Sequence, residues 1–593
     1  MPRRARNSHP RRNAAPLTFA TLWKAFLIVA SGLLVYAPAV HGEWLWDDDE
    51  AIPLNPDLKD PWGWLTVWSG ASPSADYFPL TATVRWIQWQ VFHEAVAGYH
   101  LCNIALHLAS ALLIWRVFWK LGIGLPWLGG LIFAIHPIFV ESVAWISELK
   151  NTLSLPLLLL SFLAWLDFGN SRKGVAYAVS LGCFLLAVAA KSSVVTFPLI
   201  LLLHTWWKTA KITRRNLVEV LPFLLVSVAF GLFTIHFQFQ RAIGDEPLPA
   251  GDFVDRTLIA GLAVAFYLWK TILPIHLLPM YPQWIADRTD VLLWLPWPLL
   301  VAGFLWAWRH RASWGRHVIF GFGVFLISLA PVLGFIDMAY MRISWTADHF
   351  LYLPNLGLLG LAVAGVNRVL TPPSPPAMRK AGVGAIILVV ALWMGTAFRH
   401  AGRFVDEETL WTYTLSQNPD AWQAHTRLAM ALIKRGDAEA VRVHFAEAQR
   451  LRPDLAQTAT NYANILEDTG DIDGAIVMRR MAVELSPEFP FCRFMLARTL
   501  AQSGRLDEAR MELETLVRMR PDDANNLVNL GQVLHALDRN TDALRRFNEA
   551  LEIDPSLADA RTQRDILEAE LANDAPINLW NAPAGITDPM DDR

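Results

Sequence analysis

Cysteine and charge are both scarce in this chain. Its 593 residues include only Cys102, Cys183 and Cys492. These isolated cysteines exclude a disulfide framework and offer no zinc-site spacing. Charged residues make up 18% of the chain and hydrophobic residues 54%, with a mean hydropathy of +0.30. Such values indicate an integral membrane protein in a lipid bilayer, and we expect no nucleic-acid partner.

Apolar runs recur between residues 17 and 398, each close to the ~20 residues that a helix needs to cross the hydrocarbon core. The basic tail 1–16 precedes the first run and is expected in the cytoplasm. The sequence therefore predicts a multi-span membrane domain over 17–398. The predicted spans are 17–40, 100–120, 125–140, 152–168, 175–190, 193–207, 217–237, 291–308, 318–336, 349–367 and 382–398.

One further apolar segment, 257–278, is ambiguous because it carries Lys270 and is interrupted by Pro274 and Pro279. If it does not cross, eleven spans result and all basic loops lie in the cytoplasm, as the positive-inside rule requires. If it crosses, the basic cluster Arg309–Arg316 lies outside and the C-terminal region is cytoplasmic. We favour eleven spans, with the C-terminal region outside the cytoplasm in a periplasm-like space.

A 34-residue period follows the apolar region. It is marked by Pro419, Pro453, Pro487, Pro521 and Pro555, and a turn residue recurs within each unit as Gly436, Gly470, Gly504 and then Asp538. This period predicts tetratricopeptide repeats, which are paired antiparallel helices that bind extended partners and do no chemistry. We expect a connector over 399–421, the repeat solenoid with its capping helix over 422–572, and a disordered tail over 573–593.

Small residues recur where the two helices of a repeat must meet. They are Ala429, Ala463, Ala497 and Gly531 on the first helices, and Ala475, Ala509 and Ala543 on the second.

The first outer loop, 42–99, is too long for a simple connector. It opens with Asp47-Asp48-Asp49-Glu50. Such a cluster reads either as a solvated acidic turn or as a general base, metal site or cation site at the mouth of a membrane cavity. Other ionisable groups lie at the outer ends of spans or in this loop, and each alone could be a helix cap. Together they suit a reaction between an anionic lipid carrier and an external acceptor: Arg85, His136, Glu141, Glu148, Lys150, Lys191, Asp348 and His349.

Five short blocks occur in a familiar order. They are Trp46-Asp47-Asp48, Tyr77-Phe-Pro-Leu-Thr81 with Arg85, His136-Pro137-Ile-Phe-Val-Glu141, Ala190-Lys191, and Asp348-His349-Phe-Leu-Tyr352. With the repeats, they cover essentially residues 17–560. In these blocks the chain resembles the transmembrane and tetratricopeptide-repeat protein O-mannosyltransferases, in their bacterial form.

The resemblance implies an all-α protein with a polytopic glycosyltransferase domain of the GT-C fold. Such an enzyme moves a sugar, here expected to be mannose, from a polyprenyl-phosphate donor to Ser or Thr of a protein acceptor on the outer face. Asp47 and Asp48 match the catalytic acidic pair, and Glu141 and Lys191 match polar positions near the site. Asp348 stands where the family has Glu, and His349 stands where many members have Arg.

A lipid-phosphate leaving group needs little protonation, so one carboxylate base suffices and attack opposite the phosphate inverts the anomeric centre. Cations would stabilise the departing phosphate; Arg85, Lys191 and His349 are the candidates, with Lys150 as a further one. No cofactor is required, although a divalent cation bridging Asp47 to Asp49 is compatible with the sequence.

Asparagines on the first helices of the repeats, Asn461, Asn464 and Asn529, are candidates for binding the acceptor or a partner protein. Ordinary surface asparagines are the alternative reading. Two other function classes stay open: a non-catalytic membrane scaffold that recruits partners through its repeats, and a lipid-linked sugar transferase or flippase for envelope glycans.

Overall fold

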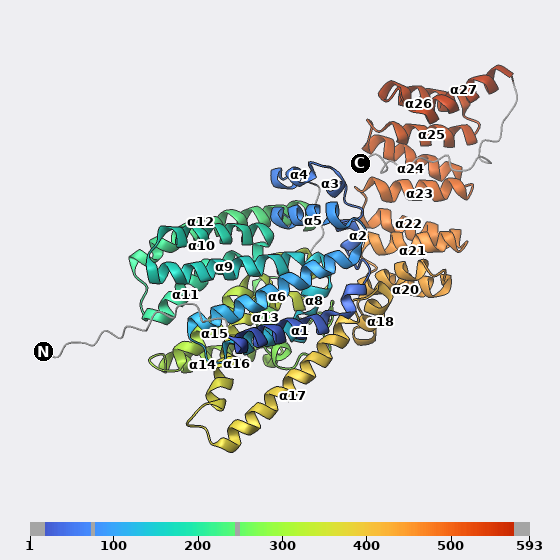
Figure 1. Ribbon diagram of the computed structural model, residues 1–593. Coiled ribbons are helices and arrows are strands. Elements are labelled where there is room, and N and C mark those ends of the chain that lie inside the picture. The colour runs from blue at the N-terminus through green and yellow to red at the C-terminus, as the bar shows by residue number, and fades with distance from the viewer. Residues whose placement is uncertain (1–17, 73–76, 244–249, 574–593) are drawn as a thin grey trace. The chain divides into compact units, whose positions relative to one another are not determined.

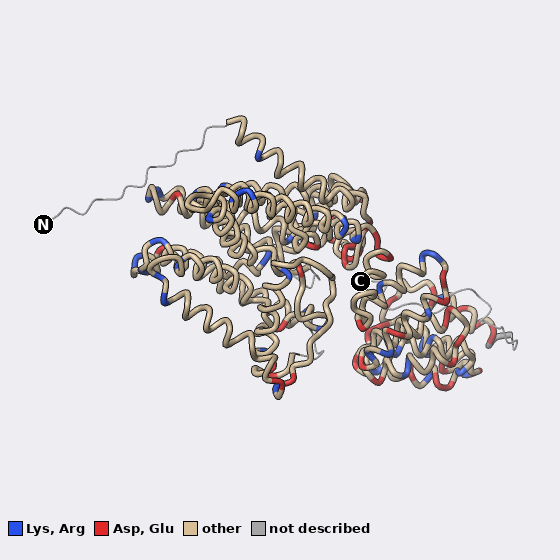
Figure 2. The backbone as a smooth tube through the Cα atoms, turned by 90° about the horizontal axis from the view of Figure 1, so that it is seen from below, with Lys and Arg blue, Asp and Glu red and all other residues tan. Residues whose placement is uncertain are grey.

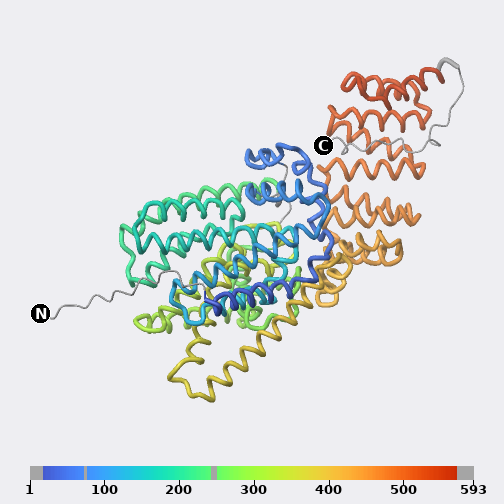
Figure 3. Tube along the Cα trace, in the orientation of Figure 1, coloured from blue at the N-terminus to red at the C-terminus, as the bar shows by residue number. Residues whose placement is uncertain are grey.

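The computed structural model describes residues 18–72, 77–243 and 250–573. The predicted basic tail 1–16 and the predicted disordered tail beyond residue 573 lie outside these ranges. The described elements are all helical, which confirms the all-α prediction. The chain divides into two compact units, Met1–Asn418 and Pro419–Arg593. Figure 1 labels the helices of each unit, and Figure 3 follows the same trace without side chains or ribbons.

The first unit contains the apolar helices. Among the described residues, seven helical segments are long and apolar enough to cross a membrane. An eighth results if α7 (Pro126–Ile135) and the following Pro137–Ala144, bent by 56°, form one broken span. The seven are Phe19–Tyr36 (α1), Val96–Leu121 (α6), Ile146–Ser171 (containing α9, Leu149–Ser171), Arg214–Arg241 (containing α12, Arg214–Phe237), Val291–Arg309 (containing α14, Pro296–Arg309), Gly315–Val332 (containing α15, Gly315–Leu329) and Pro376–Ala401 (α17).

By the length and composition of the described helices, seven or eight can cross a membrane, fewer than the eleven spans predicted. Three predicted spans are short helices: α10 (Gly174–Ala190), α11 (Phe197–Thr209) and α16 (Asn355–Leu370). The helices α10 and α11 are short because Lys191 and the 3-10 turn Ser192–Thr196 separate them. The 13 residues of α11 rise only about 20 Å, against the ~30 Å of a hydrocarbon core.

The ambiguous segment forms α13 (Phe253–Ile272), which is not among the membrane-crossing candidates. Lys270 near its end is buried, and its ammonium donates to the carbonyls of Ile275 and His276 at 2.7 and 2.9 Å. The chain therefore turns sharply after this helix.

The first outer loop folds into short helices, α2 (Asp48–Ala51), α3 (Pro56–Lys59), α4 (Gly63–Ser69) and α5 (Pro79–Phe92). The Thr81 hydroxyl at the start of α5 donates to the carbonyl of Ala190 at 2.8 Å. After α12, Arg241 binds the carbonyls of Gly70 and Ser72. These contacts fix the loop onto the ends of α10 and α12.

Of the predicted connector 399–421, residues 399–418 belong to the first unit, and most of them are helical. After α17 ends, α18 (Glu407–Gln417) begins with Asp406 as its cap, since the Asp406 carboxylate accepts from the N–H of Thr409 at 2.7 Å. Asn418 donates to the carbonyl of Met280 at 3.1 Å. The boundary between the two units then falls between Asn418 and Pro419.

The second unit is a stack of helical hairpins, as the 34-residue period predicted. Each repeat proline from Pro453 to Pro555 stands two residues beyond the end of a second helix. The described helices are α19 (Trp422–Ile433), α20 (Ala438–Leu451), α21 (Ala456–Asp468), α22 (Ile472–Leu485), α23 (Pro490–Gln502), α24 (Leu506–Met519), α25 (Ala524–Ala536), α26 (Asn540–Ile553) and the capping α27 (Ala558–Asn573). Figure 2 shows that charged residues are dense along this unit, whereas long stretches of the first unit carry none.

The turn residue of each repeat has a left-handed backbone, with φ of 74°, 86° and 79° at Gly436, Gly470 and Gly504. Asp538 adopts φ 60° in the fourth repeat without being a glycine. A left-handed residue ends a helix at little cost when it is glycine, which explains the recurrence. The small residues of the period are buried, as expected where paired helices meet.

Candidate active site

Asp48 is completely buried and ties the first outer loop to the segment before α9. Its Oδ1 accepts from the main-chain N–H and the hydroxyl of Ser147 at 2.8 and 2.6 Å, and its Oδ2 accepts from the N–H of Leu45 at 3.0 Å. Burial, followed by the charge of Asp47, raises the pKa of Asp48 to about 7. Both of its oxygens are therefore engaged in holding the backbone.

Asp47 faces a cavity of about 450 Å³. One of its carboxylate oxygens, Oδ1, is buried and has no hydrogen-bond partner among the described residues. Apart from Lys150, the lining comes from the first outer loop. The polar part comprises Asp47, Glu50, Asn55, Asp57, Ser72, Thr81, Arg85 and Lys150, and the aromatic part Trp64, Phe78 and Trp86.

Two cations join Asp47 at this cavity. Arg85 on α5 donates from Nη2 to the carbonyl of Ser147 at 2.9 Å, so Ser147 links Asp48 to Arg85. Lys150 forms an ion pair with Glu148, Nζ to Oε1 3.2 Å. A cavity lined by carboxylates and by two cations can accept a proton and bind an anion.

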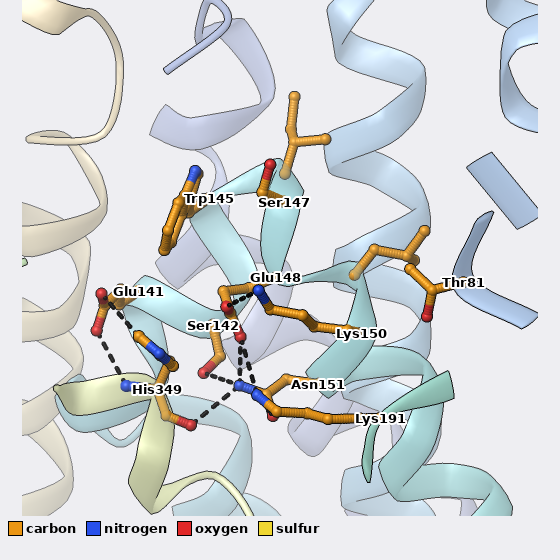
Figure 4. A network of polar contacts seen from close by, with 12 residues as sticks. Thr81, Glu141, Ser142, Trp145, Ser147, Glu148, Lys150, Asn151, Lys191 and His349 are labelled. Atoms are coloured by element: carbon orange, nitrogen blue, oxygen red, sulfur yellow. Dashed lines mark hydrogen bonds and ion pairs between the residues drawn. The ribbon is translucent and has the colours of Figure 1, made fainter. Parts of the chain in front are cut away.

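Glu148 is buried and lies at the centre of a polar network shown in Figure 4. Besides Lys150, it pairs with Lys191, Nζ to Oε2 3.4 Å. The Lys191 ammonium also donates to Asn151 Oδ1 at 2.8 Å. Asn151 in turn donates to Glu148, to Ser142 and to the carbonyl of His349. The network joins the start of α9, the end of α10 and the segment before α16.

His349 binds Glu141 rather than the cavity. Its main-chain N–H donates to Glu141 Oε2 at 3.0 Å, and its Nδ1 lies 3.1 Å from Oε1 (Figure 4). The neighbouring Asp348 accepts from the Tyr281 hydroxyl at 2.8 Å. Burial, followed by the Glu141 charge, raises the pKa of Asp348. These groups form a second buried cluster beside the Glu148 network.

Several residues predicted for the site do not line the cavity. His136 contacts the carbonyl of Thr271 at 3.0 Å, and the Tyr352 hydroxyl lies 2.8 Å from His107 Nδ1 in the helix core. The cavity lining also lacks Asp49, Glu141, Glu148, Lys191, Asp348 and His349. The predicted residues that do line it are Asp47, Arg85 and Lys150.

The cavity also contains residues that the sequence reasoning did not select. Asp57 accepts from the Ser72 hydroxyl at 2.6 Å, and Trp86 donates to the carbonyl of Asp60 at 2.9 Å. Asp57 belongs to the motif Asn55-Pro56-Asp57, and this motif could have marked it as a candidate site residue. Among the described residues, no group of three His, Cys, Asp or Glu side chains is arranged to hold a metal ion.

A second cavity, of about 380 Å³, lies among α6, α9, α11, α15 and α16 and is mainly apolar. It shares no lining residue with the cavity that Asp47 lines. The two cavities are therefore distinct.

The three candidate asparagines of the repeats differ in their surroundings. Asn461 is partly exposed. Asn464 accepts from Arg479 Nη2 at 3.1 Å. Asn529 is buried, with an exposed fraction of 1%.

An apolar multi-helix unit followed by a tetratricopeptide solenoid defines an integral membrane protein with a protein-binding type of repeat. The Tetratricopeptide repeat family model matches residues 494–558. Solved structures similar to the repeats include YrrB, described as a TPR protein with an unusual peptide-binding site. It is 18% identical, covers 31% of this chain and 89% of that one, and has a TM-score of 0.25.

Curated relatives extend across both units. The chain is 24% identical to protein O-mannosyl-transferase TMTC4 of Homo sapiens over 499 residues, which cover 70% of this chain and 65% of that protein. It is 21% identical to protein O-mannosyl-transferase TMTC3 of Homo sapiens, covering 92% of this chain and 66% of the relative. The family resemblance is thus confirmed: the chain is homologous to the transmembrane and tetratricopeptide-repeat protein O-mannosyltransferases. The matched part spans about 65% of the length of these relatives.

Proposed function

We propose that the protein is a glycosyltransferase that moves a sugar from a polyprenyl-phosphate donor to Ser or Thr of a protein acceptor on the outer face. The observation that carries the proposal is the cavity at which Asp47, Arg85 and Lys150 meet. The names of the curated relatives support transfer of mannose to protein. The GT-C fold is part of the same proposal and rests on the family resemblance.

In this proposal Asp47 is the general base. It takes the proton of the acceptor hydroxyl as the oxygen attacks the anomeric carbon, and the phosphate leaves from the opposite side with inversion. Asp48 is a poorer candidate, because both its oxygens already accept hydrogen bonds. It instead fixes the backbone that carries Asp47.

Arg85 and Lys150 stabilise the negative charge that develops on the departing phosphate. Arg85 is held by the Ser147 carbonyl and Lys150 by Glu148, so both cations are anchored before the donor arrives. Lys191 and His349 act from outside the cavity: Lys191 shares Glu148 with Lys150, and His349 orients Asn151 through its carbonyl. This assigns them positioning roles instead of direct phosphate contacts.

The placement of the site on the outer face is supported by the two ends of α13. Before the helix, Arg241 binds the first outer loop at Gly70. Near its other end, the Thr271 carbonyl lies 3.0 Å from His136 Nε2, and the Thr271 hydroxyl donates to Asn355 at 2.9 Å. His136 and Asn355 belong to segments predicted on the outer side, so the chain enters and leaves α13 on one side. That arrangement favours a periplasmic repeat unit.

The repeat unit would hold the acceptor or a partner protein, as tetratricopeptide solenoids bind extended polypeptide. Of the three asparagines, the partly exposed Asn461 is the best placed for this role. Asn464 and Asn529 fit it less well, because one binds Arg479 and the other is buried.

The test compares Asp47→Asn with Asp49→Asn in the purified full-length protein, given polyprenyl-phosphate mannose and a Ser/Thr-containing peptide. We expect Asp47→Asn to lose at least roughly 100-fold in turnover, the range typical of a lost general base, while Asp49→Asn stays close to wild type. Equal transfer by wild type and Asp47→Asn would disprove the assignment of the base. Intact-mass analysis of envelope proteins and polysaccharide from a deletion strain separates protein mannosylation from envelope-glycan synthesis and from a scaffold role.

A further inference from the structure

The start of the first outer loop, residues 43–50 (the acidic loop), is hydrogen-bonded to α18, which leads to the repeat unit, and to Val405 just before that helix. Glu407 at its start accepts the main-chain N–H of Trp46 on Oε1 at 2.6 Å. Its second oxygen, Oε2, accepts the indole N–H of Trp411, one turn further along α18. The N–H of Glu43 also donates to the carbonyl of Val405 at 2.8 Å. One oxygen of the Glu407 carboxylate thus binds the acidic loop, and the other binds Trp411 within α18 itself.

Trp46 needs such support because its backbone has φ 56°, a left-handed conformation that residues other than glycine seldom adopt. Its ring stacks on Trp145 with centroids 4.7 Å apart, and it meets the ring of Trp411 edge-on at 5.3 Å. Trp411 is fully buried. The left-handed residue immediately precedes Asp47, so its conformation sets the direction in which the Asp47 side chain leaves the backbone.

We propose that Glu407 is a positioning residue for Asp47. Through Glu407, α18 holds the backbone of Trp46 in the conformation that directs the Asp47 side chain into the cavity. This inference rests on the proposed function. Glu407 touches neither the cavity nor the reacting groups; it acts through the Trp46 N–H and the Trp411 indole. A carboxylate suits the place because one group accepts two N–H donors at once.

The helix that carries Glu407 also provides the covalent connection to the repeat unit. Pro419, the first residue of the second unit, follows α18 after a single residue, Asn418. Asn418 and Gln417 hold the far end of the helix, through the Met280 carbonyl at 3.1 Å and through His276 at 2.7 Å. The covalent link to the repeats therefore leaves the first unit from the same helix that supports the acidic loop.

The experiment measures kcat and KM of the full-length protein with polyprenyl-phosphate mannose and a Ser/Thr peptide. We expect Glu407→Ala to lower kcat roughly 10- to 100-fold, the effect of a displacement near 1 Å, with donor KM changed less than about 3-fold. The matched control is Glu488→Gln, an exposed glutamate of the repeat unit, which should behave as wild type.

A paired substitution isolates the hydrogen bonds. In Glu407→Gln, the amide oxygen can still accept from Trp46, but its NH2 group then faces the indole N–H of Trp411, and two donors repel. Trp411→Phe removes that indole donor. The double variant should therefore recover kcat from the level of Glu407→Gln toward that of Trp411→Phe alone. A residue needed only for folding would not give this recovery.

An activity-independent measurement separates this inference from the proposed function. In a chain whose three cysteines are alanine, Asp47→Cys reports the cavity through its rate of alkylation by a small charged reagent. We expect Glu407→Ala to change that rate several-fold. Inactive wild-type protein would contradict the proposed function, and the alkylation rate would still decide the role of Glu407. Unchanged kcat together with unchanged alkylation overturns the inference, as does an equal loss in every variant including the double one.

Discussion

Asp48 accepts both the main-chain N–H and the hydroxyl of Ser147, a residue 99 positions further along the chain. The carbonyl of the same Ser147 accepts from Arg85. One serine therefore orients the acidic loop and a cation of the cavity together. Replacement of Asp48 or Ser147 should therefore disturb the conformation of the loop, and the chemistry of Asp47 only as a consequence.

The first prediction concerns the pH dependence of stability through Asp48. Its carboxyl has a pKa near 4 in the unfolded chain and of about 7 in the folded one, raised by burial and by Asp47. Between these values the folded chain binds the extra proton, so this contribution to stability is complete below about pH 4 and is lost as the pH rises toward 7. Thermal unfolding in detergent between pH 5 and pH 8 should show a steeper fall for wild type than for Asp48→Asn. Parallel pH curves would contradict the assignment.

The second prediction concerns Glu148, which is fully buried between Lys150 and Lys191. Glu148→Gln removes the negative charge with which both lysines pair. Breaking a buried pair in this way typically costs about 3–5 kcal/mol, so we expect a lower unfolding temperature and poor yield. Glu219→Gln is a useful control, because its partners Arg172 and Arg215 are largely exposed. Equal stability of both variants would show that the network contributes little.

The third prediction distinguishes the two lysines. Lys150 lines the cavity, whereas Lys191 does not and binds Asn151 and Glu148. Lys150→Gln should therefore raise the donor KM or lower kcat roughly 10- to 100-fold, with a smaller loss of stability than Glu148→Gln because Glu148 keeps its pair with Lys191. Lys191→Gln should mainly lower the unfolding temperature. Steady-state kinetics and thermal unfolding on both variants test this, and the reverse pattern would place the phosphate beside Lys191.

The fourth prediction concerns packing in the last repeat. A Cβ on Gly531 would meet the buried ring of Phe547 at 2.6 Å, which is too close for any side chain. Gly531→Ala should therefore destabilise the repeat unit by about 1–3 kcal/mol, even though alanine favours a helix. Phe547→Leu should relieve the clash, because the preceding repeat pairs Ala497 with Leu513 at these positions. Limited proteolysis of the full chain measures the effect; a stable Gly531→Ala variant would show that the ring moves aside.

Local pattern sufficed for the repeat unit. Its 34-residue period predicted the helix pairs, the turns at Gly436 to Asp538 and the small residues between paired helices, because each repeat contacts chiefly its neighbours. Span lengths were harder to predict. The sequence placed the break at Lys191, between the predicted spans 175–190 and 193–207. Apolar composition does not reveal that Glu148 and Asn151 from another segment stabilise this break.

The sequence by itself determined that the chain is an apolar helical membrane protein with tetratricopeptide repeats, and that acids cluster after the first apolar helix. Composition and periodicity are sufficient for those features because they depend on solvent and on near neighbours in the chain. Only the tertiary structure decided how those acids differ. Asp48 is buried against Ser147, Asp47 faces a cavity with Arg85 and Lys150, and Trp46 is held by Glu407, 361 positions away. Such roles depend on donors brought from distant segments, and no local pattern encodes where those donors will lie.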